Sequence, residues 1–288
     1  MNFSTNIAIL ALLLGALGPV SARTPDRRLE QVVNSMPASG TIEIDTQGHV
    51  AGYTIKDAEA YDQALLDLMA RNIQRWVFKP VLVDGVPRQA RFDMFLRLQA
   101  KPLDDGRFEV SIASAAFGRG DAAPANTRVT VRGERQPPRY PEGELRNGIG
   151  GTVLVLLRIG PDGNVVDAAV EQTNLAAIGR EGAMNAWRKD LERATLAAAK
   201  HWTFDPPTAG EDAGKRDWIV RTPVVFTPAV RAAPVVPGQW QRYVPGPRYA
   251  LAWKDRKPSA DAGIDALPGG RLFTVEQPLH LLTSLNPE

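Results

Sequence analysis

A Trp-x-Phe-x-Pro pattern occurs twice in the sequence and constrains the fold more than any other feature. Its copies are Trp76, Phe78 and Pro80, and Trp202, Phe204 and Pro206. Each copy follows a run in which apolar residues recur every three or four positions, which is typical of an amphipathic helix. Proline stops a helix, and rings two positions apart point to one side of an extended chain. Each copy therefore predicts a corner where a helix packed on a sheet ends and the chain turns toward the next strand.

A second repeated pattern, made of strand, glycine turn and strand, precedes each corner. Residues 42–45 align with residues 157–160 when the turn residues Gly48 and Gly163 are matched. Alternating apolar residues mark a buried strand face, and glycine provides the positive φ that such turns require. Each half is thus predicted to hold a hairpin, a helix and a third strand. In the first half, the helix covers 61–76, the third strand covers 88–99 and a fourth strand covers 107–112. In the second half, a loop at 174–182 precedes the helix at 184–202, and the third strand covers 217–227.

These patterns predict an α+β fold with two tandem units, each a short antiparallel sheet with one helix packed on a face. A chain of 288 residues that is 44% hydrophobic is long and apolar enough for two cores. The predicted divisions are an export signal at 1–22, a first unit at 23–117, a linker at 118–134, a second unit at 135–228 and a proline-punctuated tail at 229–288 with short strands at 248–253 and 271–275.

The N-terminus has the pattern of an export signal. An uncharged apolar run from Ile7 to Leu17 is followed by small residues that end at Ala22, which resembles a cleavage site. Cleavage after Ala22 would release the chain into the periplasm. The alternative is an inner-membrane anchor formed by residues 5–20, although this run is shorter than the roughly 20 apolar residues that span a bilayer.

Composition excludes several classes of function. The chain has no cysteine, so disulfides and thiolate metal sites are excluded. A net charge of +2 with both signs interspersed provides no basic stripe for nucleic acid. The three histidines, His49, His201 and His280, have spacings that suggest neither a metal site nor a nucleophile with its base. We therefore expect a non-enzymatic protein with no cofactor, no metal and no nucleic-acid partner.

Five short elements of the second half, in this order, resemble the C-terminal domain of the TonB family. They are residues 137–141, 148–155, 161–165, 202–206 and 223–226, and they include Pro141, Gly151, Gly163, Trp202, Phe204 and Pro206. The resemblance covers residues 135–228. Residues 38–100 resemble a degenerate second copy, which keeps Gly48, Trp76, Phe78 and Pro80 but lacks the Tyr-Pro pair of Tyr140 and Pro141.

The resemblance implies that an exposed sheet edge binds an extended segment of another protein by strand addition. The implied docking edge consists of Arg221, Thr222, Pro223, Val224, Val225 and Phe226, and the segment beside it carries Gln136 and Tyr140. Proline is confined to strand edges because it lacks the N–H donor of a ladder. Pro223 and Arg221 have a second interpretation, in which they only protect the edge from aggregation. For Tyr140, packing within the domain is the alternative to partner contact.

Proteins of this family carry force from an inner-membrane motor to outer-membrane receptors. Where family transducers have an anchor and a proline-rich spacer, this chain has a signal-like start and a folded unit. Of the family's activity, the resemblance therefore implies strand capture here rather than the transmission of force. The expected partner is an envelope protein, such as an outer-membrane TonB-dependent receptor. The alternative is a structural protein that pairs with itself as a strand-swapped homodimer. A proline in place of Val224 is expected to remove one donor of the docking edge.

Overall fold

The structure is a computed structural model that describes residues 31–83, 85–103, 107–118, 124–210, 212–228, 236–249, 266–275 and 279–287. The predicted export signal and residues 119–123 of the predicted linker lie outside these residues. The fold is α+β with antiparallel sheets and few helices, as the sequence predicts.

The first sheet is built on one long strand, β1. Its members are β1 (Val33–Ile44), β2 (Val50–Ile55), β5 (Ala90–Pro102), β6 (Phe108–Gly118) and β12 (Gln241–Tyr243). The two edges of β1 pair with β5 on one side and with β2 and β12 on the other, and β6 is paired with the far edge of β5. Helix α1 (Gln63–Ile73) links β2 toward β5 and buries Leu65, Met69 and Ile73 against the sheet. A small hairpin, β3 (Leu82–Val83) and β4 (Val86–Pro87), follows the first corner, and a 3-10 turn, η2 (Ala58–Ala60), precedes α1.

The second sheet has the same central arrangement. Its members are β8 (Gly151–Ile159), β9 (Val165–Leu175), β11 (Trp218–Phe226) and β13 (Phe273–Thr274), in the order β13, β11, β8, β9. Helix α3 (Glu181–Ala199) links β9 toward β11 and buries Met184 and Leu191. Before β8 lie η3 (Ala125–Thr127), β7 (Thr130–Val131) and α2 (Glu142–Arg146), and β7 pairs with β10 (Phe204–Asp205). Strand β9 extends into the predicted loop, because its residues up to Leu175 pair with β8.

The two Trp-x-Phe-x-Pro corners cross the glycine turns of their hairpins in the same way. The N–H of Phe78 donates to the carbonyl oxygen of Gly48 at 2.8 Å, and that of Phe204 donates to Gly163 at 2.9 Å. Both glycines have positive φ, 93° and 84°. A Cβ atom at either one would overlap the carbonyl oxygen of the phenylalanine that passes over it. The glycine turn and the aromatic corner thus require each other.

The segments that complete the two corners come from different parts of the chain. The indole Nε1 of Trp202 donates to Gln136 at 2.8 Å, just before the second sheet, and Arg132 donates its N–H to Thr203 at 3.0 Å. At the first corner the indole of Trp76 donates to Leu285 at 3.1 Å, and Leu282 donates its N–H to Val77 at 2.8 Å. The C-terminal residues therefore take, on the first sheet, the place that residues 131–136 take on the second.

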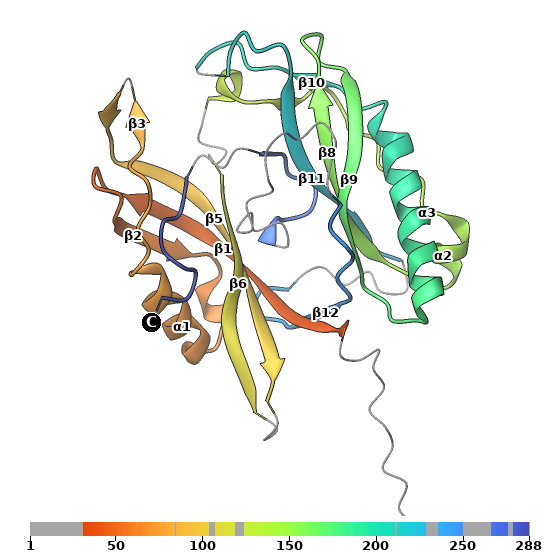
Figure 1. The fold of residues 1–288 in the computed structure, drawn as a ribbon, viewed down its shortest axis with the longest axis horizontal. Helices are drawn as coiled ribbons and strands as arrows, with labels where there is room; N and C mark the ends of the chain where they lie inside the picture. The colour runs from red at the N-terminus through yellow and green to blue at the C-terminus, as the bar shows by residue number, and fades with distance from the viewer. Residues whose placement is uncertain are drawn as a thin grey trace, which may run out of the picture.

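The helices lie on the outer sides of the molecule and the helix-free faces of the sheets look toward each other (Figure 1). Residues around β13, drawn in blue, lie between the sheets (Figure 1). A small apolar cluster joins the layers there, made of Phe95, Ala116, Leu154, Ala266, Leu267 and Phe273. The predicted tail strand at 271–275 corresponds to β13. The one predicted at 248–253 does not form over residues 248 and 249, and the rest of that range lies outside the described residues.

Candidate functional site

The proposed docking residues form most of β11, whose Val, Ile and Thr residues favour strand. Alternate side chains face opposite sides of the sheet. Val220, Val224 and Phe226 are buried under α3. Thr222 and Pro223 are also buried, whereas the side chain of Val225 is 53% exposed. Apart from Val225, residues 221–226 can therefore meet a partner only through their main-chain groups.

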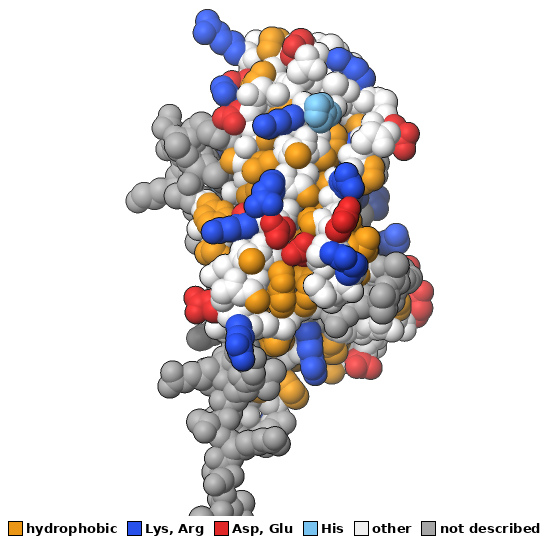
Figure 2. Space-filling model, turned by 90° about the vertical axis from the view of Figure 1, so that its right-hand side faces the viewer, with side chains coloured by type: hydrophobic (Ala, Val, Ile, Leu, Met, Phe, Trp, Pro, Cys, Tyr) orange, Lys and Arg blue, Asp and Glu red, His pale blue; other side chains and the backbone are white. Residues whose placement is uncertain are grey.

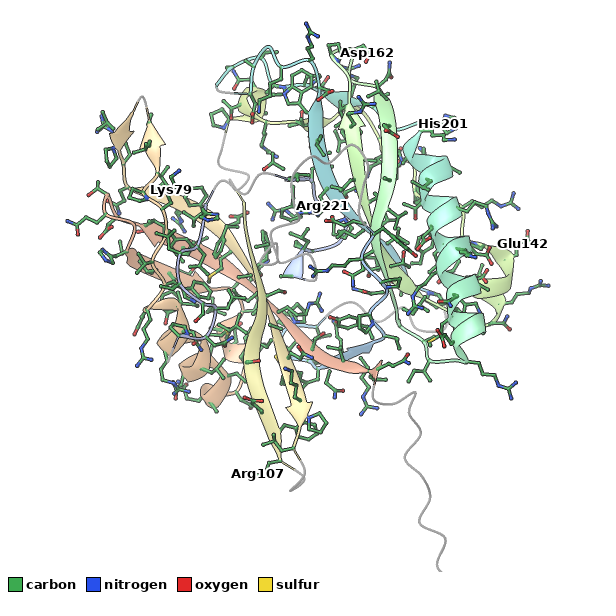
Figure 3. The ribbon with its side chains drawn as sticks, viewed as in Figure 1. Lys79, Arg107, Glu142, Asp162, His201 and Arg221 are labelled. Atoms are coloured by element: carbon green, nitrogen blue, oxygen red, sulfur yellow. The ribbon has the colours of Figure 1, made fainter. Side chains whose placement is uncertain are left out.

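Arg221 lies between the two sheets (Figure 3), and its guanidinium is paired with Glu171 of β9. The two contacts are 2.6 Å, from Nε to Oε2, and 2.9 Å, from Nη2 to Oε1. Both side chains are only 4% exposed. Such a two-point, charge-assisted pair fixes the orientation of both side chains. The side chain of Arg221 is thus held inside the protein and is not available to a partner in this arrangement.

The main chain of β11 has an inner and an outer edge. The carbonyl oxygens of Ile219 and Pro223 accept hydrogen bonds from Val275 and Gly270, on the side away from β8. Because hydrogen-bonding direction alternates along a strand, the odd-numbered residues face outward and the even-numbered ones face β8. Pro223 lacks its N–H on the outer side, so the ladder to β8 is intact.

This alternation of outward and inward main-chain groups changes the expected effect of a proline in place of Val224. The N–H of Val224 faces β8, so a proline there would remove an internal donor and damage the sheet. The outward N–H is that of Val225. Val225, and not Val224, is therefore the position at which a probe reports on the outer edge.

The outer edge of β11 is partly filled by the chain itself, which corrects the expectation of a three-stranded sheet with this edge unpaired. Strand β13 pairs with it at two positions, Val220 with Thr274 and Arg221 with Phe273. The N–H of Gly270 donates to Pro223 at 2.9 Å. We call residues 269–275 the strap. The strap lies along the edge at which the sequence predicts that a guest strand binds.

Gln136 and Tyr140 serve the fold at the positions where the structure places them. The carbonyl oxygen of Gln136 accepts the indole N–H of Trp202. The hydroxyl of Tyr140 donates to Ile149 at 2.9 Å, and its ring packs edge-on against Phe226 at 5.3 Å. Burial, and secondly the charge of Glu144, raises the pKa of Tyr140. These contacts favour the packing interpretation of Tyr140.

Arg135 joins three parts of the site and was missed by the sequence patterns. Its guanidinium donates to the hydroxyl of Thr222 at 3.2 Å and to the carbonyl oxygen of Gly270 in the strap at 2.6 Å. The same group lies 5.0 Å from the ring centroid of Trp202. A cation over an aromatic face is attracted by the ring quadrupole. Arg135 therefore links the corner, β11 and the strap.

The residues predicted as structural landmarks lie at the corners, turns and strand starts of the two sheets. Trp76, Phe78, Trp202 and Phe204 are all buried. Pro80 and Pro206 follow them and are half-buried, and Pro141 directly precedes α2. Gly151 starts β8, where a Cβ atom would lie 2.5 Å from the carbonyl oxygen of Asn174. Gly48 and Gly163 are the turn residues described above.

The other edge of the second sheet is also covered by C-terminal residues. Val244 and Leu175 exchange main-chain hydrogen bonds of 2.8 and 3.0 Å, and Tyr249 donates its N–H to Glu171 at 2.9 Å. Arg188 of α3 crosses this edge and donates to the carbonyl oxygens of Thr173 and Pro245. The hydroxyl of Thr173 in turn donates to Glu192 at 2.7 Å.

Glu192 provides a pH-dependent test of this packing. Burial raises its pKa, against the opposing effects of the Thr173 hydrogen bond and Arg188. A raised pKa in the folded state stabilises the fold below the ordinary pKa of the carboxyl group, and this stabilisation is lost as pH rises through the folded value. We therefore expect Glu192→Gln to gain stability relative to the wild type as pH rises from about 4 to 7, measured by thermal unfolding. The exposed Glu142→Gln is the control, and an equal pH trend in both variants would contradict the assignment.

The described residues contain no group of three or more His, Asp or Glu side chains arranged to hold a metal ion. On the face beside α3, basic and acidic side chains are interspersed and form no patch of one sign (Figure 2). Among the helices in the described ranges, none is both long and apolar enough to cross a bilayer. What the arrangement offers chemically is a strand edge and the side chains around it.

The second half of the chain matches a known family. Residues 136–228 match the family model described as Gram-negative bacterial TonB protein C-terminal. Two curated relatives, each named Protein TonB, come from Xanthomonas campestris pv. campestris strains B100 and ATCC 33913. Each is 33% identical over 91 residues, which is 31% of this chain and 34% of the relative. The chain thus spans about a third of the length of these relatives. No solved structure matches. The resemblance predicted from the sequence is thereby confirmed: residues 136–228, which contain β8, β9, α3 and β11, match the TonB C-terminal family.

Proposed function

We propose that this chain is a non-enzymatic, TonB-like interaction protein of the cell envelope that captures an extended segment of a partner by strand addition at residues 221–226 of β11. The observation that carries the proposal is the pairing of β11 with the strap, in which this edge holds an extended antiparallel segment of the same chain, as it would hold a segment of a partner. The match to the TonB C-terminal family supports an envelope partner.

In this proposal the first sheet belongs to a degenerate second copy that offers no strand edge to a partner. Strands β2, β1 and β5 are connected and ordered like β9, β8 and β11. The edge of β5 that corresponds to the docking edge is filled by β6 through ten residue pairs of one hairpin. A guest strand would have to break this hairpin, whereas the strap pairs with β11 at two positions. The proposal therefore assigns strand addition to the second copy alone.

The proposed setting is the periplasm, after cleavage behind Ala22, with an outer-membrane TonB-dependent receptor as partner. The alternative of a strand-swapped homodimer receives less support. Residues 244–249 and the strap already pair with both edges of the second sheet within one chain. A homodimer would need to exchange these segments between copies.

A photo-crosslinking residue at position 225 tests the proposal in cells that express the full chain. We expect it to form a crosslink to an envelope protein, because the side chain of Val225 is 53% exposed beside the outer edge of β11. Val166 is the matched control, since its side chain is 54% exposed at the start of β9. The crosslinked protein is identified by mass spectrometry.

Three outcomes separate the functions. A heterologous product at position 225 and none at position 166 supports strand capture. A product that contains two copies of this chain favours the homodimer. Equal products at both positions, or none at position 225, would overturn the proposed capture of an envelope partner at this edge.

A further inference from the structure

The strap is recognised by side chains as well as by its main chain. Alternate residues of an extended segment point the same way, so Arg271 and Phe273 share one face. The ring of Phe273 packs edge-on against Phe95 of β5 at 5.5 Å, inside the cluster that also holds Leu154 of β8. The guanidinium of Arg271 donates to Asp93 of β5 at 2.9 Å and lies 5.2 Å from the ring centroid of Phe95. The first sheet thus contacts two side chains of a segment whose main chain pairs with the second sheet.

The site around the strap has defined requirements. Its apolar part, formed by Phe95, Ala116 and Leu154, suits an aromatic ring. Its acidic part, Asp93, suits a cation two positions earlier. Where the strap passes Val225, a Cβ atom at Gly269 would lie 2.6 Å from the valine Cγ2. A small residue four positions before the ring therefore fits best.

The strand ladder between the strap and β11 is short. Two residue pairs join it to β11, whereas nine join β11 to β8. The ion pair of Arg271 and Asp93 is partly exposed, at 39% and 25%, so solvent weakens it. The strap competes chiefly because it is tethered, which gives it an effective concentration on the order of millimolar. A free segment with the same side chains and micromolar affinity could not displace the tethered strap at low concentration, unless the strap is weakened or the segment makes further contacts.

We propose, on the basis of the proposed function, that the outer edge of β11 with Asp93 and Phe95 is a receptor site for an extended partner segment that carries a cationic residue and, two positions later, an aromatic residue. Residues 269–275 fill this site until such a partner displaces them. The partner class is therefore an extended peptide of the pattern small-x-cation-x-aromatic. The strap therefore indicates how such a peptide would bind, and it also competes with the peptide for the site.

A labelled synthetic peptide of residues 269–275 tests the proposal by fluorescence anisotropy with the full chain. The variant Phe273→Ala weakens the strap and leaves the site intact, so we expect it to bind the peptide at least tenfold more tightly than the wild type does. Arg271→Ala is a second, partly exposed substitution and is expected to have the same effect to a smaller degree. Circular dichroism verifies that each variant remains folded.

Two peptide controls test the recognised side chains. A peptide with alanine in place of phenylalanine should lose most of its binding to Phe273→Ala. A peptide with glutamate in place of arginine should bind weakly to Phe273→Ala and regain affinity when Asp93→Lys is added to that variant. Equal binding of all peptides, or no gain over the wild type in either weakened variant, would overturn the proposal.

The outcome is separable from that of the proposed function. A crosslink at position 225 without peptide selectivity would retain strand capture and reject the cation-aromatic pattern. Selective peptide binding without a crosslink would retain the receptor site and reject the envelope partner. A concentration-dependent dimer that is lost in Phe273→Ala would make a second copy the occupant, which counts against this inference.

Discussion

Arg221→Ala is expected to destabilise the fold by about 3 to 5 kcal/mol. The reason is the buried partner: the Glu171 carboxylate, 4% exposed, would lose a two-point contact of 2.6 and 2.9 Å. Removing one partner of a buried ion pair is strongly destabilising, because the charge that stays buried loses this compensation. Thermal and urea unfolding of the purified chain measure the effect, which corresponds to a decrease in melting temperature on the order of 10 °C.

Two control variants show whether burial causes this loss. Arg193→Ala breaks a contact of similar length, 2.8 Å to Asp190, at the surface of α3, where Arg193 is 76% exposed. It should cost less than about 1 kcal/mol. Replacing both buried partners, Arg221→Met with Glu171→Leu, should recover most of the stability, since both charges of the pair are then removed from the interior. If Arg221→Ala cost no more than Arg193→Ala, water would reach Glu171 and the close packing of the two sheets would be wrong.

The repeated hairpin, helix and corner could be predicted because each rests on local chemistry. Glycine at the turns, apolar residues at helical spacing, and proline after two aromatic residues all act within a few positions of one another. The predicted third strand at 217–227 corresponds to β11 within one residue at each end. The cores beneath α1 and α3 follow from the same patterns.

The pairing of the edge strands could not be predicted, because strands of two or three residues carry no periodicity that indicates a partner. The sequence predicts a strand at 271–275, but not that it pairs with β11. Strands β12 and β13 contain three and two residues and lie in a proline-punctuated region. Their pairing depends on surfaces that form only after both sheets have folded. The same is true of residues 280–285, which complete the first corner, more than 200 positions from Trp76 along the chain.

Arg221 illustrates the limit of strand patterns. A charged residue in an alternating strand is typical of a solvent-facing or edge position. Here the face opposite α3 is covered by the first sheet, and Glu171, which is 50 positions away, neutralises the charge. The sequence gives no sign of this pairing. Likewise, the position of Arg135 beside the strap depends on the path of residues 269–275.

Gly163→Ala is expected to destabilise the second sheet by about 3 kcal/mol or more. Gly163 has a φ of 84°, which costs any other residue about 1 to 3 kcal/mol. In addition, the new Cβ would overlap the carbonyl oxygen of Phe204, where the buried corner crosses the turn. The main chain on both sides is fixed by the 2.9 Å hydrogen bond from Phe204 to Gly163, so neither can yield at low cost. Urea unfolding measures the loss, and Gly48→Ala should behave alike because Phe78 crosses Gly48 in the same way.

Gly214→Ala separates the two causes of this effect. Gly214 has a similar φ of 76°, but a Cβ atom there would meet nothing within 4 Å. It should therefore cost only about 1 kcal/mol, through backbone strain alone. The excess of Gly163→Ala over Gly214→Ala then measures how tightly the corner is held against the turn. Equal losses in the two variants would mean that Phe204 does not pass over Gly163 in solution. The inference that the glycine turn and the Trp-x-Phe-x-Pro pattern require each other would then be wrong, because it depends on the close passage of the corner over the turn.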